Sequence, residues 1–340
     1  MKYYLLICLC LFSEWALIAQ TKPNFFPEDI PSTGVEQVCF CKPGVSNKSK
    51  SRGLEISYTW LGKSSFISEE DEVTKLSTFN TLQNVSFSVK IPIIYKPGFA
   101  LILGYKYASD YYNFEDVGTE YAATFQEMEE KPLKRNAFDI IMTKSLDEKR
   151  YLAGRLGYSA NGNYTDWLHF DQQYSIFKFL GLYAIKPNEN FEWGFGISGS
   201  KSFRRTSFIP FIVYNKTFNN KWGIESIFPG YINGRYNINP ANILLFGSEY
   251  DSKSYRLNTN RPTSDNLDYA LNHSGIVFSA QLDHQFSPWV WANIKVGYRF
   301  NLDSEFMAKN PNTFSFDADV SDAPFLQIGL FVTPPENFKE

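Results

Sequence analysis

Most of the chain after Arg52 alternates apolar and polar residues, which is the pattern of β-strands whose two faces meet different surroundings. In residues 278–283 and 294–302 every second residue is apolar, and the residues between are polar, charged or glycine. Helical periodicity is confined to the N-terminus and to residues 121–130. A chain patterned in this way is predicted to be all-β.

Alternation occurs in soluble sandwiches as well as in membrane barrels, so the spacing of the turns decides between them. Short connections fall near residues 96–98, 147–149, 186–190, 219–220, 239–242 and 287–288. Longer polar connections lie between them, at residues 63–82, 109–135, 161–172, 258–266 and 303–323. Outer-membrane barrels have this order of short periplasmic turns and long extracellular loops. The pattern therefore favours a transmembrane antiparallel up-and-down β-barrel.

The strand count depends on Pro229-Gly230, a turn signal in the middle of residues 222–238. A split there gives fourteen strands, an even number that places both ends of the chain on one side of the membrane; without it the count is thirteen, and twelve is the fallback. The fourteen predicted strands cover residues 53–62, 83–95, 99–108, 136–145, 150–160, 173–185, 191–203, 206–218, 221–228, 231–238, 243–257, 268–286, 289–302 and 324–333.

The N-terminus has the layout of a secretory signal peptide: one basic residue, an apolar run, and a small residue at Ala19 before a polar stretch. We expect residues 1–19 to be removed on export and residues 20–51 to form a periplasmic segment that could enter the barrel as a plug. The barrel is then expected over residues 52–333 and a tail over residues 334–340. This organisation predicts an integral protein of the outer membrane of a Gram-negative bacterium.

If the apolar rows face lipid, the opposite rows line the lumen. An Arg or Lys on the lipid side costs about 2 to 4 kcal/mol at mid-membrane, so charges should be confined to the inner row. The predicted lumen therefore carries six acids and six bases and is nearly neutral: Glu55, Asp139, Glu192, Glu225, Glu249 and Asp283 with Lys90, Lys106, Arg155, Arg235, Lys295 and Arg299. These charges could pair across the lumen and hold the barrel in shape, or they could line a path for a solute.

Outer-membrane enzymes exist, so histidines near a serine or an acid are candidates for catalysis. His273 and Ser274 are adjacent, but neighbouring residues of a strand point to opposite faces and cannot form a nucleophile–base pair. His169 lies near Asp166 and Asp171 in a predicted external loop, where a solvated histidine is the simpler interpretation. No catalytic residues are assigned, and we do not expect an enzyme.

Metal, cofactor and nucleic-acid sites are not predicted. Cys39 and Cys41 precede the barrel without a nearby His or further Cys to complete a tetrahedral zinc site, so a thiol pair or a disulfide is expected. His284 is expected at the membrane interface, and the acidic run 127–130 in solvent. The net charge of -3 gives no electrostatic reason for nucleic-acid binding.

A family resemblance rests on the stretch 207–257. Its Asn219-Asn220-Lys221-Trp222, Phe228-Pro229, Arg235-Tyr236 and Ser254-Tyr255-Arg256-Leu257 are similar to the recurrent pattern of a family of bacterial outer-membrane β-barrels known mainly as a domain of unknown function. The resemblance implies a fold and a location, with outer-membrane lipids and the barrel assembly machinery as partners. It implies no substrate and no catalytic residues.

The leading hypothesis from the sequence is a channel or uptake protein for small or apolar solutes. A closed structural or adhesive barrel that acts through its extracellular loops, particularly residues 109–135, is the alternative. An outer-membrane hydrolase is a third and weaker hypothesis.

Overall fold

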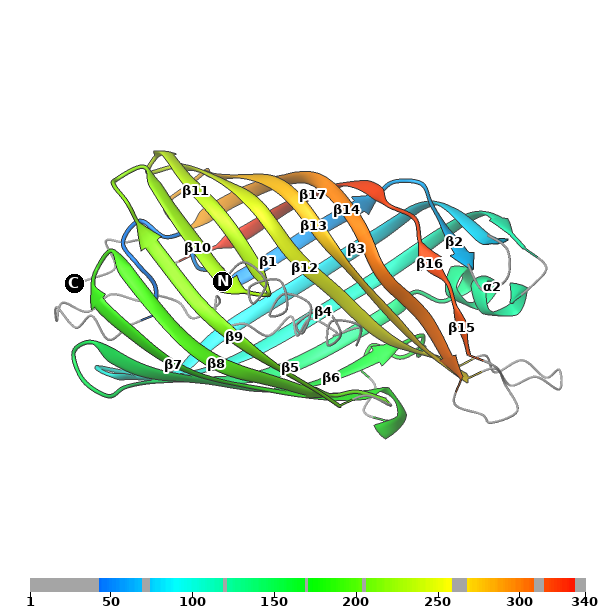
Figure 1. The fold of residues 1–340 in the computed structure, drawn as a ribbon, viewed down its shortest axis with the longest axis horizontal. Coiled ribbons are helices and arrows are strands. Elements are labelled where there is room, and N and C mark those ends of the chain that lie inside the picture. Colours follow the sequence, from blue (N-terminus) through cyan, green and yellow to red (C-terminus); the bar gives the residue numbers. More distant parts are fainter. Residues whose placement is uncertain are drawn as a thin grey trace, which may run out of the picture.

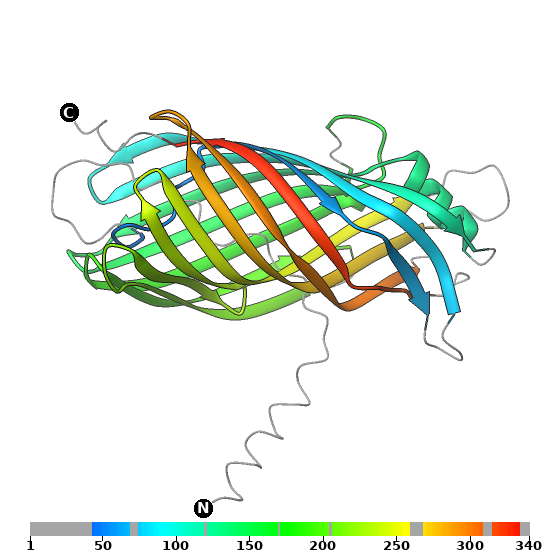
Figure 2. The ribbon, with the colours of Figure 1, turned by 90° about the horizontal axis from the view of Figure 1, so that it is seen from above.

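The computed structural model describes residues 43–68, 74–118, 121–168, 171–203, 206–258, 268–308 and 315–333. One antiparallel sheet closes on itself, because β1 (Leu54–Leu61) pairs with β3 (Thr74–Lys96) on one side and with β17 (Ala323–Val332) on the other. Figures 1 and 2 show the resulting barrel and the tilt of its strands. The chain therefore forms a closed antiparallel β-barrel.

The sheet has seventeen strands, of which β2 (Ser64–Ser68), β15 (Phe316–Asp317) and β16 (Asp319–Val320) are short pieces at one end, which leaves fourteen in the barrel wall. The remaining wall strands are β4 (Phe99–Val117), β5 (Leu133–Ser145), β6 (Arg150–Gly162), β7 (Ser175–Asn188), β8 (Phe191–Lys201), β9 (Thr206–Thr217), β10 (Trp222–Phe228), β11 (Tyr231–Asn239), β12 (Asn242–Asn258), β13 (Asp268–Gln285) and β14 (Val290–Ala308).

The predicted count of fourteen is confirmed, including the split at Pro229-Gly230 between β10 and β11. Strands β3 and β4 are longer than predicted and extend to Thr74 and Val117. The added part of β3 places Leu76, Phe79 and Leu82 in a buried apolar cluster. Register shifts on both sides of Phe79 break the period of two that marks a membrane strand. The helical pattern at residues 121–130 corresponds to α2 (Ala122–Glu130).

The two ends of the barrel differ in their connections. The short-turn end contains the turns β3–β4, β5–β6, β7–β8, β9–β10, β11–β12 and β13–β14, while the long-loop end contains α2, the 3-10 turn η2 (Gln172–Tyr174) and the longer connections. Figure 1 shows α2 and β2 together at the long-loop end. The predicted alternation of short and long connections is confirmed over most of the chain. The exception is the predicted one, residues 203–238, where the connections at both ends are short.

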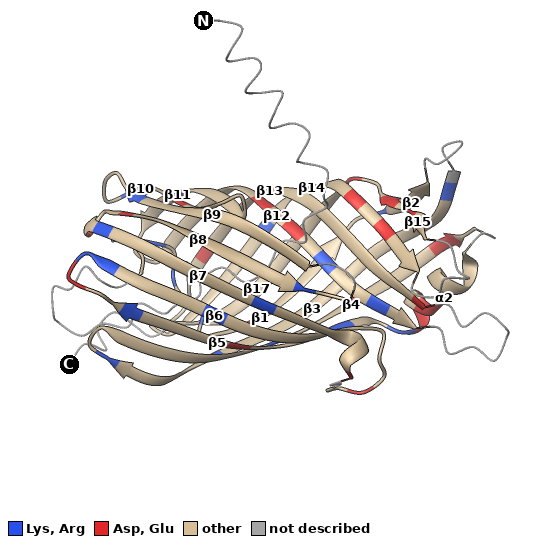
Figure 3. Cartoon of the chain, turned by 60° about the horizontal axis from the view of Figure 1, so that its bottom comes forward, with Lys and Arg blue, Asp and Glu red and all other residues tan. Residues whose placement is uncertain are grey.

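The outer face of the wall is apolar. Leu103, Ile140 and Leu156 are cross-strand neighbours on β4, β5 and β6, and their side chains are 43%, 48% and 62% exposed. The residues next to two of them, Asp139 and Arg155, are buried on the inner side. In Figure 3 the charged positions are scattered along strands that are otherwise uncharged. Apolar residues outside and charged residues inside are the arrangement of a barrel embedded in lipid.

None of the helices in the described part of the chain is long and apolar enough to cross a bilayer.

The wall narrows toward the long-loop end. Gly162 of β6 pairs in parallel with Arg256 of β12, and the Asn161 side chain donates to the Ser254 carbonyl at 2.9 Å. The pairing of β6 with β7 ends at Ala160, and β6 then meets β12 directly, so β7 to β11 do not enclose the lumen at this level. Figure 1 shows the β10–β11 hairpin ending well short of the level that β12 reaches.

Several features predicted from the sequence lie outside the described residues: the signal peptide at residues 1–19, Cys39, Cys41, His169, and the tail at residues 334–340.

Candidate functional site: a charged lumen between two closures

A cavity of about 440 Å³ lies in the lumen. One side of it is lined by residues 48–52, which precede the first strand, and another by Leu61, Leu82, Tyr255 and Phe325 from the apolar cluster at the long-loop end. Serines and charged side chains of the strands line the space between. The cavity therefore extends from the segment at the short-turn end to the apolar cluster at the other.

Ten of the twelve predicted lumen residues line this cavity, and Glu192 and Arg235 do not. Those two lie at the short-turn end, where both are buried. The ten that line it are Glu55, Lys90, Lys106, Asp139, Arg155, Glu225, Glu249, Asp283, Lys295 and Arg299.

The part of the lumen that the cavity occupies is more positive than the nearly neutral lumen that was predicted. Ten bases and six acids line the cavity, a difference of four positive charges. The additional bases are Lys48, Lys50, Arg52, Arg135 and Lys253, and the additional acid is Asp251. Residues 48–52 precede the first strand, so period two does not place their charges in the lumen. Arg135 precedes the predicted strand 136–145 by one residue and is therefore predicted to lie in a loop.

Ion pairs in the lumen run along the wall as well as across it. Arg155 and Asp139, on adjacent strands, approach to 2.7 Å, and Lys295 and Glu249, two strands apart, approach to 2.9 Å. Lys253 of β12 reaches across the lumen to Asp110 of β4 at 2.9 Å. Both kinds of pair compensate charges that burial would otherwise make costly.

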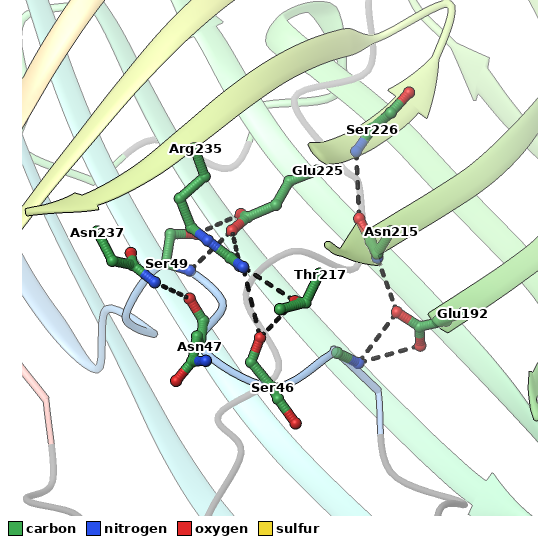
Figure 4. Close-up of polar contacts among 11 residues, drawn as sticks. Ser46, Asn47, Ser49, Glu192, Asn215, Thr217, Glu225, Ser226, Arg235 and Asn237 are labelled. Carbon is green, nitrogen blue, oxygen red and sulfur yellow. Dashed lines mark hydrogen bonds and ion pairs between the residues drawn. The ribbon is translucent and has the colours of Figure 1, made fainter. Parts of the chain in front are cut away.

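The lumen segment, residues 43–52, lies inside the barrel at the short-turn end (Figure 4). The Gly44 amide donates to both carboxylate oxygens of Glu192, at 3.0 and 3.1 Å. The Ser49 amide donates to Glu225 Oε1 at 2.8 Å, and the Ser49 hydroxyl donates to Glu225 Oε2. Two of the predicted lumen acids thus accept hydrogen bonds from backbone N–H groups of a segment that does not pair with the sheet.

Arg235 completes the attachment of the lumen segment. Its guanidinium pairs with Glu225 at 2.9 Å, donates to Thr217 Oγ1 at 2.9 Å and reaches the Ser46 carbonyl at 3.4 Å. The Arg235 side chain is fully buried. The segment then continues past β14, where the Lys50 ammonium lies 5.8 Å from the ring centre of Trp291. Its contacts therefore reach from β8 around to β14.

The long-loop end is filled by an aromatic cluster, defined by Phe66, Phe79, Phe125, Phe306 and Phe316 together with the aliphatic residues packed on them. The Phe125 ring, from α2, lies 5.1 Å from that of Phe66 and 5.9 Å from that of Phe306. The rings of Phe306 and Phe316 stack at 4.6 Å. A ring of about eight strands is narrow enough for side chains to fill, so the narrowing of the wall where β6 meets β12 favours this solid end.

Helix α2 sits on this cluster with Phe125 and Met128 fully buried. Glu127, expected in solvent, is 3% exposed, pairs with Lys131 at 2.6 Å and accepts from Asn163 at 3.0 Å. The expectation failed because the loop folds back into the barrel mouth. In the following loop, burial raises the pKa of Tyr164 to about 12, and its neutral hydroxyl donates to the Ala160 carbonyl at 3.0 Å.

The residues considered for catalysis do not assemble. The buried His273 shares a hydrogen bond with Ser304, and the Ser274 hydroxyl donates to the Asp303 carbonyl at 3.4 Å. Asp171 accepts from the Gln173 amide at 3.1 Å and begins η2. His284 lies near the short-turn end with its Nδ1 2.7 Å from Asn242 Oδ1. Within the described ranges, no three His, Cys, Asp or Glu side chains gather as metal ligands would.

The architecture and the lumen together define a fourteen-strand transmembrane β-barrel whose interior is charged in the middle and filled at both ends. Residues 47–333 match the family described as a domain of unknown function, DUF6268, and the chain belongs to that family. No curated protein matches the sequence.

Solved outer-membrane proteins resemble the chain in overall shape at low identity. An outer membrane channel from Pseudomonas putida F1 is 11% identical, with a TM-score of 0.43 over 86% of this chain and 99% of that one. A FadL homologue from Pseudomonas aeruginosa is 9% identical, with a TM-score of 0.41 over 82% and 89%. The outer membrane protease OmpT from Escherichia coli is 12% identical, with a TM-score of 0.30 over 86% and 99%.

Proposed function

We propose that this protein is an outer-membrane channel for small polar solutes that is shut at both ends in the state described. The short-turn end faces the periplasm and the long-loop end faces outward, as in bacterial barrels of this class. The lumen segment is the periplasmic plug and the aromatic cluster under α2 is the outer closure. The observation that carries the proposal is the charged cavity of about 440 Å³ between them.

The lining of the cavity favours polar solutes over apolar ones. Charges and hydroxyls dominate it, and an apolar solute would displace water from these groups without replacing their hydrogen bonds. Sites for small molecules typically measure about 300 to 1,000 Å³, so the space suits a small metabolite. A barrel with a purely structural role would gain more from an apolar, close-packed interior.

The two closures lie in series along the lumen, so removing each one and both together tests the proposed channel. We would compare the full chain, a variant lacking residues 43–51, a variant with a Gly-Ser linker in place of residues 119–132, and the combined variant by single-channel recording in planar bilayers. Since blocks in series must both be removed, the combined variant should conduct far more than either single variant. Heat-modifiable gel mobility checks that each barrel is folded.

The proposal is contradicted if the folded combined variant conducts no better than the full chain. It is also contradicted if the full chain never admits a small solute into liposomes at any applied voltage.

A closed barrel that acts through its loops is the second candidate, because both ends are filled. Replacement of residues 119–132 that abolishes binding to a surface while leaving permeability unchanged would favour it.

A further inference from the structure

Four bases gather on one wall of the lumen, on four successive strands. They are Lys106 on β4, Arg135 on β5, Arg155 on β6 and Lys178 on β7. Lys106, Arg135 and Arg155 lie close enough to act electrostatically on Lys178, and the acids near the cluster are Asp139 and Asp251. Asp139 is engaged by Arg155 at 2.7 Å. Asp251 pairs with Arg299 at 3.2 Å. The four bases therefore outnumber the two acids near them.

Two of these bases are left without a compensating contact. Among the described residues, neither Lys178 Nζ nor the Arg135 guanidinium makes a hydrogen bond or an ion pair, and Arg135 Nε is buried without a partner. Both side chains are partly buried. A charge removed from water is costly unless it is paired, so the arrangement calls for an anion.

A small side pocket joins this cluster to β12. It is lined by Arg135, Lys178 and Lys253 and by polar side chains from three strands: Asn161, Ser200, Ser252 and Ser254. Its volume of about 20 Å³ admits a group the size of a water molecule. Arg135, Lys253 and Tyr255 line both this pocket and the main cavity, so the two spaces adjoin.

The pocket contains an unused donor and an unused acceptor. The Ser252 hydroxyl and Asn161 Oδ1 are both buried without a hydrogen-bond partner among the described residues. The Asn161 amide nitrogen donates to the Ser254 carbonyl at 2.9 Å. Asn161 and Ser252 are 4% and 5% exposed. An oxyanion that still carries a proton would suit such a pocket, because its O–H donates to Asn161 and its other oxygens accept from Ser252, Arg135 and Lys178.

We propose that this cluster and its side pocket bind a phosphate group, which at neutral pH can carry one proton. One P–OH oxygen enters the side pocket, the remaining oxygens face Arg135 and Lys178, and the rest of a phosphate ester lies in the main cavity. This inference rests on the proposed channel function, because it names the class of solute. Phosphate itself and small phosphate esters share the chemistry.

Equilibrium dialysis of the full-length protein in detergent, at pH 7 and low chloride with labelled inorganic phosphate, tests the site. One saturable equivalent is expected. Lys178→Gln and Arg135→Gln should each weaken binding by about tenfold or more, because each removes a charge-assisted contact. Lys201→Gln, with the same charge change at an exposed position of β8, is the matched control and should bind as the unchanged protein does. If Arg135→Gln does not fold, Lys178→Gln decides.

Sulfate, which carries no proton at pH 7, should compete poorly. Competition by glycerol phosphate that is stronger than that of inorganic phosphate identifies an ester as the ligand, and weaker competition identifies free phosphate. Absence of saturable binding, unchanged affinity in folded Lys178→Gln, or equal loss in Lys201→Gln overturns the proposal. Intact phosphate binding in a protein that never conducts contradicts the channel and leaves the site standing.

Discussion

Glu225 offers the most direct perturbation of the lumen segment. Its carboxylate is 3% exposed and accepts the amide and the hydroxyl of Ser49 as well as the guanidinium of the fully buried Arg235. Glu225→Gln keeps the shape of the side chain and removes the charge. The two contacts to Ser49 then change from charge-assisted to neutral hydrogen bonds.

The expected size of the effect follows from these contacts. A hydrogen bond to a charged group contributes about 1.5 to 3 kcal/mol, against about 1 kcal/mol for a neutral one. Two such bonds make docking of the lumen segment weaker by about 1 to 4 kcal/mol. Since about 1.4 kcal/mol corresponds to a factor of ten in an equilibrium, the undocked population should rise by roughly five-fold to several hundred-fold.

Hydrogen–deuterium exchange read by mass spectrometry measures this population. In Glu225→Gln, peptides covering residues 43–52 should exchange faster by that factor, while peptides from β13 should keep the rate of the unchanged protein. Asp139→Asn is the control: it removes a buried lumen carboxylate of the same charge whose ion pair is with Arg155 on the wall. Unchanged exchange of residues 43–52 in Glu225→Gln, or an equal increase in Asp139→Asn, would refute the reasoning.

Three further predictions concern the stability of the barrel, measured by urea unfolding in lipid vesicles. Phe125→Ala should cost about 3 to 5 kcal/mol, because it empties the centre of the aromatic cluster; no loss of stability would mean that α2 is not packed there. Ile140→Arg on the outer face should cost about 2 to 4 kcal/mol, whereas Gln281→Arg at the cavity should cost much less; equal costs would contradict the assigned faces. Asp110→Asn, which deprives Lys253 of its partner, should cost about 1 to 3 kcal/mol, and a double variant with Lys253→Met should recover part of it.

The strands could be predicted from the sequence because the membrane imposes one environment on each face. Alternation gives no lumen side where both faces of a strand are apolar, as in β7 and β9. In the structure their inner rows pack in a second apolar cluster, with Leu180 and Leu182 of β7 against Phe211 and Val213 of β9. Alternation of polarity cannot distinguish a strand face that contacts lipid from one that packs in an apolar interior.

A plug formed by residues 20–51 was anticipated from the sequence, but the contacts that close the lumen could not be predicted, because they join distant parts of the chain. Gly44 and Glu192 are 148 residues apart, and Ser49 and Glu225 are 176 apart. Nothing in the local sequence around residues 43–52 indicates which strands they will meet. The positions of Glu192, Glu225 and Arg235 on inner rows were predictable from period two, but their use as anchors was not.

The low β10–β11 hairpin has a consequence for the surrounding lipid. Seven residues of β10 reach about 23 Å even without tilt, which is less than the roughly 30 Å hydrocarbon thickness of a typical bilayer. Its tip carries Phe228, which is 58% exposed. Acyl chains beside this flank should therefore shorten to match it, as they do around any short span. Because the strands on the opposite flank are long, the bilayer would be thinner on one side of the barrel only. A neighbouring protein that reduces this thinning would associate preferentially with that side.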